Sequence, residues 1–567
     1  MIYIREIIPR KFSGLSSFLV SFAFDPRVTD AIKQLPHRQY LTKDKCWEIP
    51  AECLAQALDS LTFIDTIQLI MLPEEEKPNS DDFKLTETEI SNFHFTPFQH
   101  QIDAINFGLN PTNTKWLLLD SMGLGKTLEI IGLAETLHRR GLIEHCMIIC
   151  GVDSLRQNWK SEIQKFSSES VQILGEYFTK TGSFRYRTIK ERVEILKQPI
   201  SEFFVIVNAA TLRDDDIIKT LKKCPTNFGM IAVDECHRFT TDSKQGNSLL
   251  KLTSEYQVAA TGTLLLNSPV SCYLPLAWTD NDHSTLTNFK SQYCTYGGFG
   301  GKQIVGYKNL VQLQEEIQSC SIRRTLDQVR DDMPLKNINY EVVEMNEQHR
   351  KFYEAVVDGV KSEVDKVKLN TSNLLALTTR LRQATACPGI LTSTPIVSSK
   401  IQRAVEIATD LLEQKEKVVI FSTFKETVYT LARELAMHNP LVCTGDNSEQ
   451  QIKMNVESFQ NDPTSMLMIC THGKMGTGFT LNAASYMICI DTPYTDAAFS
   501  QSTDRIWRIT NTMPAFVTVL TAADTIDVRV REIVETKKEL ADFVVDGKEN
   551  SVSDALAQEL RKILMNL

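Results

Sequence analysis

Apolar runs of strand length alternate with segments of helical periodicity through most of the chain. Residues 116–119 form one such run, and in residues 128–137 the apolar side chains recur at helical spacing. Further apolar runs occupy residues 147–150, 203–207, 230–233, 418–421 and 466–470. Strands that alternate with helices are typical of parallel sheets. The pattern therefore predicts an α/β fold for the long middle of the chain.

The N-terminal segments follow a different pattern. Residues 1–72 predict a strand, a short helix and a hairpin that ends at Pro50, which together indicate a small α+β domain. Residues 73–92 contain Pro, Asn and Ser and lack a hydrophobic period, so they are typical of a solvated linker.

Length and composition indicate a multidomain intracellular protein. The 567 residues predict three to four domains at about 150 residues each. No segment approaches the ~20 apolar residues of a membrane-spanning helix, so we expect no membrane partner. The 13 cysteines include no Cys-x-x-Cys pair, which favours reduced core thiols and no metal cluster. We expect a cytoplasmic location in a bacterium or phage and a nuclear one in a eukaryote.

The distribution of charge changes what the total implies. The formal net charge of −10 taken alone argues against a polyanionic partner. Residues 73–92 hold 7 acidic and 2 basic side chains, and residues 539–567 hold 6 and 3, so these two segments contribute −5 and −3. Residues 1–72 are neutral with 8 of each, which leaves −2 for residues 93–538. The nearly neutral middle can present a basic groove to a nucleic acid.

A glycine-rich turn between a predicted strand and a predicted helix carries the first candidate chemistry. The turn DSMGLGKT closes in Gly-Lys-Thr at Lys126 and Thr127. In such a turn, backbone N–H groups bind phosphate, the lysine reaches the β- and γ-oxygens, and the hydroxyl ligates Mg²⁺. We predict that ATP is bound by Asp120, Ser121, Met122, Gly123, Leu124, Gly125, Lys126 and Thr127.

An acidic pair ends a later apolar run. Asp234 and Glu235 follow the sequence GMIAV, 108 residues after Lys126. The carboxyl end of a strand in a parallel sheet is where Mg²⁺ and an attacking water are held. We predict that Asp234 binds the metal together with Thr127 and that Glu235 polarises the water. An isolated Asp-Glu pair is more often an exposed loop, but the preceding Lys126 turn favours catalysis.

These segments resemble the motifs of superfamily-two helicases, specifically the Swi/Snf-type double-stranded DNA translocases. DSMGLGKTLEII, DECHRF and VAATGTLLLN are similar to their nucleotide-binding, metal-binding and coupling motifs, in that order. Asp120, which replaces the glycine of the generic loop, matches this subfamily. The resemblance covers about residues 93–535. It implies two RecA-like parallel-sheet lobes with helical insertions, ATP and Mg²⁺ as cofactors, and double-stranded DNA as the partner.

The same resemblance implies roles for further residues. FTPFQHQIDAINF implies that Gln99, beside Phe98, recognises the adenine. GKMGTGF and FSQSTDRIWRI imply that Gly476, Gly478 and Gln501 contact the nucleotide. The coupling motif implies that His237, Thr261, Gly262 and Thr263 link hydrolysis to movement.

The last of these motifs contains two arginines. Arg505 and Arg508 are three residues apart, so on a helix they would share one face. The resemblance implies that both reach across a cleft towards the phosphate at Lys126, where an arginine stabilises the transition state. Isolated arginines would be interpreted as surface cations, but the neighbouring Gln501 favours arginine fingers. The predicted catalytic set is Lys126, Asp234, Glu235, Arg505 and Arg508.

A few positioned side chains can hold a phosphate backbone without a large net charge. The motifs suggest that Arg213, Thr471, His472, Lys474 and Arg382 contact DNA, with Arg323 and Arg324 as further candidates. For each basic residue, a solvated surface cation is the competing interpretation. Contacts of this kind predict low sequence specificity and strong salt dependence.

The N-terminal domain has two interpretations of equal weight. Residues 1–72 resemble the HARP-like module of annealing helicases, which would place His37, Arg38, Lys43 and Lys45 against branched or forked DNA. The alternative is a small accessory domain with Trp47 in its core.

We therefore expect an ATPase that moves along double-stranded DNA as a monomer and that remodels or anneals forked or branched DNA. The sequence identifies no wedge that would separate the strands. Two alternatives stay open, an RNA-directed or polymerase-recycling ATPase on the same motor and an inert DNA-binding scaffold. The expected domains are a HARP-like domain (1–72), an acidic linker (73–92), helicase lobe 1 (93–282), a helical lobe-joining region (283–398), lobe 2 (399–538) and a tail (539–567).

Overall fold

The computed structural model describes most of the chain between residues 2 and 531. The described ranges are 2–7, 17–22, 25–35, 38–41, 45–62, 64, 67–71, 83–151, 155–178, 184–265, 268–282, 284–297, 303–329, 334–366, 371–475, 479–494, 496–508 and 513–531. The expected tail at 539–567 lies outside these ranges.

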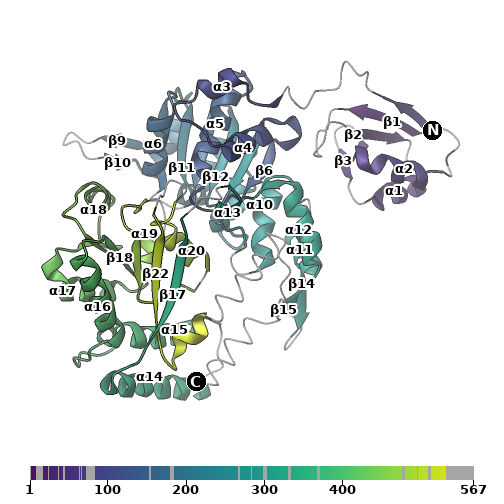
Figure 1. The fold of residues 1–567 in the computed structure, drawn as a ribbon. Coiled ribbons are helices and arrows are strands. Elements are labelled where there is room, and N and C mark those ends of the chain that lie inside the picture. Colours follow the sequence, from purple (N-terminus) through teal and green to yellow (C-terminus); the bar gives the residue numbers. More distant parts are fainter. Residues whose placement is uncertain are drawn as a thin grey trace.

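The N-terminal domain is a five-stranded sheet covered by two helices (Figure 1). Its strands run in the order β3-β4-β2-β1-β5, and its core contains Ile4, Val20 and Ile32, with Trp47 partly buried against them. The expected strand, helix and hairpin are therefore present. The elements are β1 (Ile2–Ile7), β2 (Ser17–Phe22), α1 (Pro26–Lys33), β3 (Gln39–Leu41), β4 (Cys46–Pro50), α2 (Leu54–Ser60) and β5 (Ile67–Ile70).

Lobe 1 is built on a seven-stranded, entirely parallel sheet in the order β16-β6-β13-β12-β7-β11-β8. Its central strands are mainly apolar, as expected for a sheet that helices cover on both faces. The strands are β6 (Lys115–Leu118), β7 (His145–Cys150), β8 (Val171–Ile173), β11 (Phe204–Asn208), β12 (Phe228–Asp234), β13 (Tyr256–Ala260) and β16 (Ser321–Ile322).

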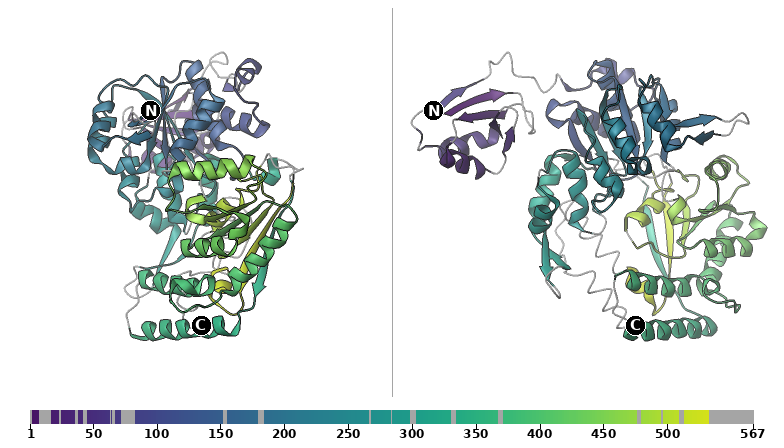
Figure 2. Two further views of the ribbon diagram at one scale, coloured as in Figure 1. Left: turned by 90° about the vertical axis from the view of Figure 1, so that its left-hand side faces the viewer. Right: turned by 180° about the vertical axis from the view of Figure 1, so that it is seen from behind.

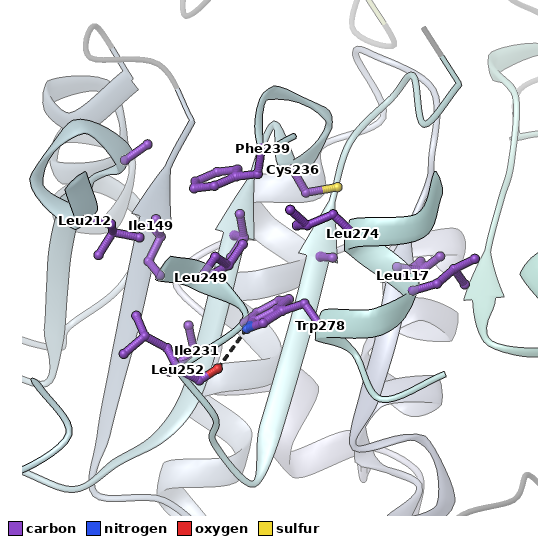
Figure 3. Packing of buried hydrophobic residues seen from close by; sticks show 14 of the residues in the cluster. Leu117, Ile149, Leu212, Ile231, Cys236, Phe239, Leu249, Leu252, Leu274 and Trp278 are labelled. Atoms are coloured by element: carbon purple, nitrogen blue, oxygen red, sulfur yellow. Dashed lines mark hydrogen bonds between the residues drawn. The ribbon is translucent and has the colours of Figure 1, made fainter. Parts of the chain in front are cut away.

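Alternate residues of these strands enter two separate cores, one on each face of the sheet. On one face, Ile231 packs near Trp278, whose indole N–H donates a 2.9 Å hydrogen bond to the Leu252 carbonyl (Figure 3). The helices of this lobe are α3 (Glu87–Ser91), α4 (Gln99–Leu109), α5 (Lys126–Arg139), α6 (Leu155–Phe166), α7 (Ile189–Leu196), α8 (Asp215–Leu221), α9 (Lys244–Leu249), α10 (Tyr273–Trp278), α11 (Leu286–Tyr293), α12 (Leu310–Ser319) and α13 (Leu326–Val329). Two hairpins, β9 (Glu176–Phe178) with β10 (Phe184–Tyr186) and β14 (Cys294–Gly297) with β15 (Gln303–Tyr307), complete it.

Lobe 2 contains a six-stranded parallel sheet in the order β17-β22-β21-β18-β20-β19. Figure 2 shows this sheet and its helices as a second body below lobe 1. Its strands are β17 (Lys336–Val343), β18 (Val418–Ser422), β19 (Leu441–Cys443), β20 (Leu467–Thr471), β21 (Tyr486–Cys489) and β22 (Ala515–Ala522). Its helices are α14 (Glu347–Lys366), α15 (Thr371–Ala386), α16 (Ser399–Glu413), α17 (Lys425–Glu434), α18 (Glu449–Asn461), α19 (His472–Met475) and α20 (Asp496–Thr503).

Two parallel-sheet lobes and a small α+β domain agree with the predicted fold class. The expected lobe-joining region at 283–398 contributes to both lobes, because β16 belongs to the sheet of lobe 1 and β17 to that of lobe 2. The chain passes from one sheet to the other between Ile322 and Lys336. Within the described ranges, no helix is long and apolar enough to cross a membrane.

Candidate nucleotide site between the lobes

The glycine-rich turn lies between β6 and α5, at the carboxyl edge of the lobe 1 sheet. Gly123 and Gly125 have φ angles of +87° and +93°, a backbone conformation that residues other than glycine rarely adopt. A Cβ atom at Gly125 would also collide with the side-chain amide nitrogen of Gln101. Gly125 caps the 14-residue helix α5, so the turn directs a helix N-terminus towards the site. This is the arrangement that binds phosphate groups.

Lys126 begins α5 and turns back over the loop. Its Nζ donates to the carbonyl oxygens of Asp120 at 2.7 Å and Ser121 at 3.3 Å. Burial lowers the pKa of Lys126, while the carboxylates of Glu235, Asp120 and other neighbours oppose that shift. The ammonium group therefore lies between the loop and the acidic pair, where a phosphate bound by the loop would reach it.

The acidic pair follows β12 at the same edge of the sheet. The Trp159 indole N–H donates a 2.8 Å hydrogen bond to Asp234 Oδ2, which fixes this carboxylate from α6. Burial and the neighbouring Glu235 raise the pKa of Asp234 to about 6. Glu235 has φ +51°, a strained value for a residue other than glycine. Its Oε2 is buried without a hydrogen-bond partner.

These residues suit a Mg²⁺ ion held jointly with a nucleotide. Within the described ranges, no group of three or more His, Cys, Asp or Glu side chains could hold a metal alone. Mg²⁺ in nucleotide sites usually has one or two carboxylates, with phosphates and waters as its other ligands. Asp234 and the Thr127 hydroxyl would supply the protein ligands, and the bound ion would neutralise charge on the phosphates. The Glu235 carboxylate beside Asp234 would orient a water.

The coupling residues connect the acidic pair to the nucleotide loop. His237 Nδ1 lies 2.7 Å from Thr261 Oγ1 and 3.2 Å from Glu235 Oε2. Burial and nearby cations lower the pKa of His237 to about 3, so the ring is neutral at physiological pH. The backbone N–H of Thr263 donates to Thr261 Oγ1 at 3.1 Å. These contacts link Glu235 through His237 to the segment after β13.

Gly262 lies where this segment meets the nucleotide loop. A Cβ atom at Gly262 would lie 2.9 Å from Met122 Cγ and 3.4 Å from Lys126 Nζ. The predicted coupling set, His237, Thr261, Gly262 and Thr263, therefore occupies one continuous region beside the loop.

Arg505 and Arg508 belong to lobe 2, but they lie beyond the end of α20 at Thr503. The expectation that they share one helix face is therefore wrong. They converge because Arg505 Nη1 and Arg508 Nη2 both donate to the Phe479 carbonyl, at 2.9 Å and 3.3 Å. Burial and the neighbouring Arg508 lower the pKa of Arg505 to about 9.

The arginine loop faces lobe 1. A Cβ atom at Gly123 would lie 3.5 Å from Arg508 Cδ and 3.8 Å from its Cα. Arg505 also interacts electrostatically with Glu235. Its Nε donates a hydrogen bond to the backbone carbonyl oxygen of Gln501, a buried residue. The site thus combines a phosphate loop and an acidic pair from one lobe with two arginines from the other.

The predicted adenine segment reaches the loop through residues that the prediction did not include. Gln99 is exposed and donates to Asp103 Oδ1 at 2.9 Å, and Phe98 is 49% exposed. The buried His100 and Gln101 instead contact the Leu124 carbonyl, at 2.8 Å and 3.1 Å. Phe98 and Gln99 are therefore accessible to a nucleotide base, while the next two residues attach the segment to the loop.

The predicted DNA contacts occupy different environments. Arg213 is exposed and donates to Gln245 Oε1 at 2.8 Å. Thr471, His472 and Arg382 are buried inside lobe 2. His472 Nδ1 lies 2.8 Å from Ser502 Oγ, and Arg382 Nη2 is 3.4 Å from Asp491 Oδ1.

All three side chains are buried, and those of His472 and Arg382 have internal partners, so the structure does not present them to a phosphate backbone in this conformation. Lys474 belongs to α19, but its side chain lies outside the described part of the structure, as do Gly476 and Gly478.

Trp159 and Gln101 are functional candidates that the sequence did not single out. Trp159 lies 75 residues from its partner Asp234, and Gln101 lies 23 residues from Leu124. Their signal was weak, because a tryptophan at an apolar helix position and a glutamine near a helix start are both common. Only the packing of α4 and α6 around the loop reveals their partners.

Models of two protein families match the chain. An "SNF2-related domain" model matches residues 100–390, and a "Helicase conserved C-terminal domain" model matches residues 399–510. An "Uncharacterized ATP-dependent helicase" from Mycoplasma pneumoniae is 25% identical over 535 residues, which are 92% of this chain and 49% of that protein. A "Putative ATP-dependent helicase/translocase YwqA" from Bacillus subtilis is 23% identical and covers 79% of this chain and 48% of that protein.

The chain thus spans about half the length of these curated relatives. Among solved structures, a Sulfolobus solfataricus SWI2/SNF2 ATPase core in complex with dsDNA is 21% identical, with a TM-score of 0.35, and covers 80% of this chain and 94% of that one.

Proposed function

The chain belongs to the SNF2-related family of helicase-like ATPases, and from that premise we propose that it hydrolyses ATP to move along double-stranded DNA. One observation supports this most strongly. The Lys126 loop and the acidic pair of lobe 1 face the Arg508 loop of lobe 2, with Arg508 Cδ 3.5 Å from a Cβ position on Gly123. Hydrolysis then requires the two lobes to close on each other, which converts the chemical step into relative movement of the lobes.

In this account, the loop and Lys126 bind the phosphates, and Glu235 orients the attacking water. Asp234, held by Trp159, and Thr127 coordinate Mg²⁺. Arg505 and Arg508 stabilise the transferring phosphoryl group when the lobes close. Phe98 and Gln99 contact the base. The contact with duplex DNA involves Arg213 and Lys474, which predicts little dependence on base sequence.

The N-terminal domain would direct the motor to forked or branched DNA, which it would remodel or anneal. Arg38 and Lys45 are exposed, and they directly precede β3 and β4, the two strands of the hairpin. Between them, Tyr40 is 42% exposed and its ring centroid lies 5.1 Å from that of Trp47. Exposed cations and an exposed aromatic ring in one hairpin suit phosphates and unpaired bases. His37 and Lys43, the other predicted contacts, lie outside the described ranges.

The test is a comparison of ATP turnover with duplex DNA, forked DNA, single strands and RNA, with and without residues 1–72. Duplex DNA should stimulate turnover in the full chain, and removal of residues 1–72 should reduce the preference for forks without abolishing duplex stimulation. Lys126→Ala should abolish hydrolysis and leave duplex binding intact.

Stimulation by RNA alone would contradict the proposal and favour an RNA-directed ATPase. Turnover no greater than that of Glu235→Gln would indicate an inert scaffold. Equal loss of hydrolysis and duplex binding in Lys126→Ala would show that Lys126 serves folding rather than catalysis.

A further inference from the structure

The segment that joins the lobes contacts both halves of the nucleotide site. It comprises residues 320–329, which pack on lobe 1, and residues 334–336, which enter lobe 2. We propose that these residues form a positioning tether, in which Arg324 holds the nucleotide loop and couples it to the arginine loop of lobe 2. The contacts of the tether are observed in the structure, whereas the reaction that they would serve is the one given under the proposed function.

The first anchor of the tether is the backbone. β16 pairs in parallel with β6, and the Arg324 carbonyl accepts a 2.9 Å hydrogen bond from the backbone N–H of Ser121 in the nucleotide loop. The Arg323 guanidinium donates to the Leu119 carbonyl at 2.6 Å and to the Gly262 carbonyl at 3.2 Å. Arg323 therefore ties the base of the nucleotide loop to the coupling segment.

The second anchor is the Arg324 side chain. Its Nη2 lies 2.6 Å from Asp120 Oδ2 and 3.5 Å from Glu129 Oε1, and its Nη1 donates to the His100 carbonyl. The carboxyl groups of Asp120 and Glu129 are almost completely buried, so this guanidinium balances the Asp120 charge where water cannot reach it. Arg324 thus joins the start of the nucleotide loop to α4 and α5. The expectation that Arg324 contacts a DNA phosphate does not fit this enclosed position.

The third anchor reaches the other lobe. Leu124, at the centre of the nucleotide loop, packs with Leu326 of α13, and Trp507 packs against this pair. Trp507 stands between Arg505 and Arg508 in the sequence, and its indole N–H donates to the Pro334 carbonyl at 2.8 Å. Trp507 therefore joins the loop, the tether and the two arginines.

Lys336 holds the same lobe 2 loop from β17. Its Nζ is 2.6 Å from Asp504 Oδ1 and 5.4 Å from the Trp507 ring centroid. Five residue steps separate Val329 from Pro334, so the covalent chain allows these points to separate by at most roughly 17 Å. The tether thus limits how far the arginine loop can move from the nucleotide loop.

The consequence is that Arg324 acts as a positioning residue for phosphoryl transfer. A nucleotide bound by the loop shifts Asp120 and Leu124, and the tether passes this shift to Trp507 and the arginines. Loss of the Arg324 guanidinium should therefore impair the step that depends on both lobes more than it impairs nucleotide binding.

The experiment measures kcat and KM for ATP, with and without duplex DNA, in Arg324→Ala, Arg324→Lys, Trp507→Ala and the Ala–Ala double variant. Arg403→Ala is the matched control, because it removes an arginine whose Nε lies 2.5 Å from Glu341 Oε1 on the outside of lobe 2. We expect Arg324→Ala and Trp507→Ala each to reduce the stimulation of kcat by duplex DNA tenfold or more. KM should change less, and Arg324→Lys should recover part of the stimulation.

The double variant distinguishes a shared path from two structural defects. It should lose no more stimulation than the worse single variant, because both residues act through one tether. Additive losses, or wild-type stimulation in folded Arg324→Ala, would overturn the proposal. If Arg324→Ala does not fold, Trp507→Ala and Arg324→Lys provide the same comparison with Arg403→Ala.

Absence of duplex stimulation in the wild type would contradict the proposed function. In that case basal kcat and KM of Arg324→Ala and Trp507→Ala still test the tether. The tether predicts a larger change in kcat than in KM, and equal changes in both would overturn it.

Discussion

At the scale of one residue, the Glu129 carboxyl group beside the nucleotide loop has an unfavourable environment for its charge. Glu129 lies in the first turn of α5, and its carboxyl group is buried beside Asp120, with Arg324 Nη2 3.5 Å from its Oε1. Burial and the nearby Asp120 carboxylate raise its pKa well above the ordinary value of 4.5. Arg324 opposes this shift but does not cancel it. Glu129 therefore holds a proton in the folded protein at pH values where the unfolded chain has lost it.

The Glu129→Gln variant tests this assignment. A carboxyl group with a raised folded pKa lowers stability as the pH rises above its unfolded value, because the unfolded state ionises first. The neutral amide removes this penalty, so Glu129→Gln should be more stable than the wild type at pH 8 by about 1 kcal/mol, or roughly 2–4 °C in Tm. The difference should shrink as the pH falls towards 4.5. A lower Tm for the variant at pH 8 would show that Glu129 is ionised and paired.

Trp159 should act on the chemical step through Asp234. Trp159→Phe keeps the ring in the core but removes the 2.8 Å hydrogen bond to the carboxylate. Because this carboxylate is predicted to ligate Mg²⁺, kcat should fall about tenfold and the Mg²⁺ concentration for half-maximal rate should rise. KM for ATP at saturating Mg²⁺ should change little.

Trp278→Phe is the matched control for this prediction. It loses a 2.9 Å indole hydrogen bond to Leu252 in the same lobe, away from the acidic pair. Both variants should lose similar stability, but only Trp159→Phe should alter the Mg²⁺ dependence. Equal kinetic effects in the two variants would refute a specific role for Trp159.

Residue patterns predicted the parts of the site that depend on local sequence. The turn ending at Lys126 and the pair Asp234–Glu235 each follow an apolar strand, and parallel strands bring such ends to one edge of a sheet. Trp159 and Arg324 were not assigned to the site because their partners are 75 and 204 residues away. Arg382 and His472 were assigned by motif alone, which does not specify whether a side chain turns inward.

At the scale of elements, α3 shows that part of the expected acidic linker is structured. Thr86 and Glu89 form a capping box at its start, in which each side chain bonds the other's backbone N–H. Glu89 also accepts hydrogen bonds from Arg140 Nε at 2.8 Å and Nη2 at 2.9 Å. The linker prediction missed this helix because its five residues bury no side chain and so lack an apolar period.

The Glu89–Arg140 pair should stabilise lobe 1 in a pH-dependent manner. The Arg140 guanidinium is the main cause that lowers the pKa of Glu89 from 4.5 to about 2. A lowered folded pKa stabilises the fold above pH 4.5, and this contribution disappears as the pH falls towards 2. Glu89→Gln should therefore lower stability by about 1 kcal/mol at pH 7.

Thermal unfolding between pH 8 and pH 3 measures this effect. The difference in Tm between the wild type and Glu89→Gln should stay constant down to about pH 5 and narrow below it. A difference that does not vary over the whole range would show that Glu89 acts through packing rather than charge.

Element boundaries explain two further departures from the predictions. The sequence around Arg505 and Arg508 was expected to be helical, but α20 ends at Thr503, and the arginines converge on the Phe479 carbonyl instead. The region at 283–398 was expected to be a helical insertion that joins the lobes, and it also contributes a strand to each sheet. Both outcomes depend on pairing between distant segments, which local periodicity does not encode.

For the whole molecule, net charge was a poor guide to the partner. Of the total of −10, residues 73–92 and 539–567 contribute −5 and −3, and the strands of the two described parallel sheets all lie between residues 115 and 522. The proposed function depends instead on two lobes that meet at one candidate nucleotide site. Each lobe alone lacks part of that site, which is why we propose that hydrolysis is coupled to movement of one lobe against the other.

Release of a third strand from a triplex tests the central claim most directly, because a protein that moves along duplex DNA displaces a strand bound in its groove. The wild type with ATP should release the third strand, and Glu235→Gln, which keeps the loop but lacks the carboxylate predicted to orient the water, should release none above the background. ATP hydrolysis by the wild type on duplex DNA, with third-strand release no faster than that of Glu235→Gln, would contradict translocation.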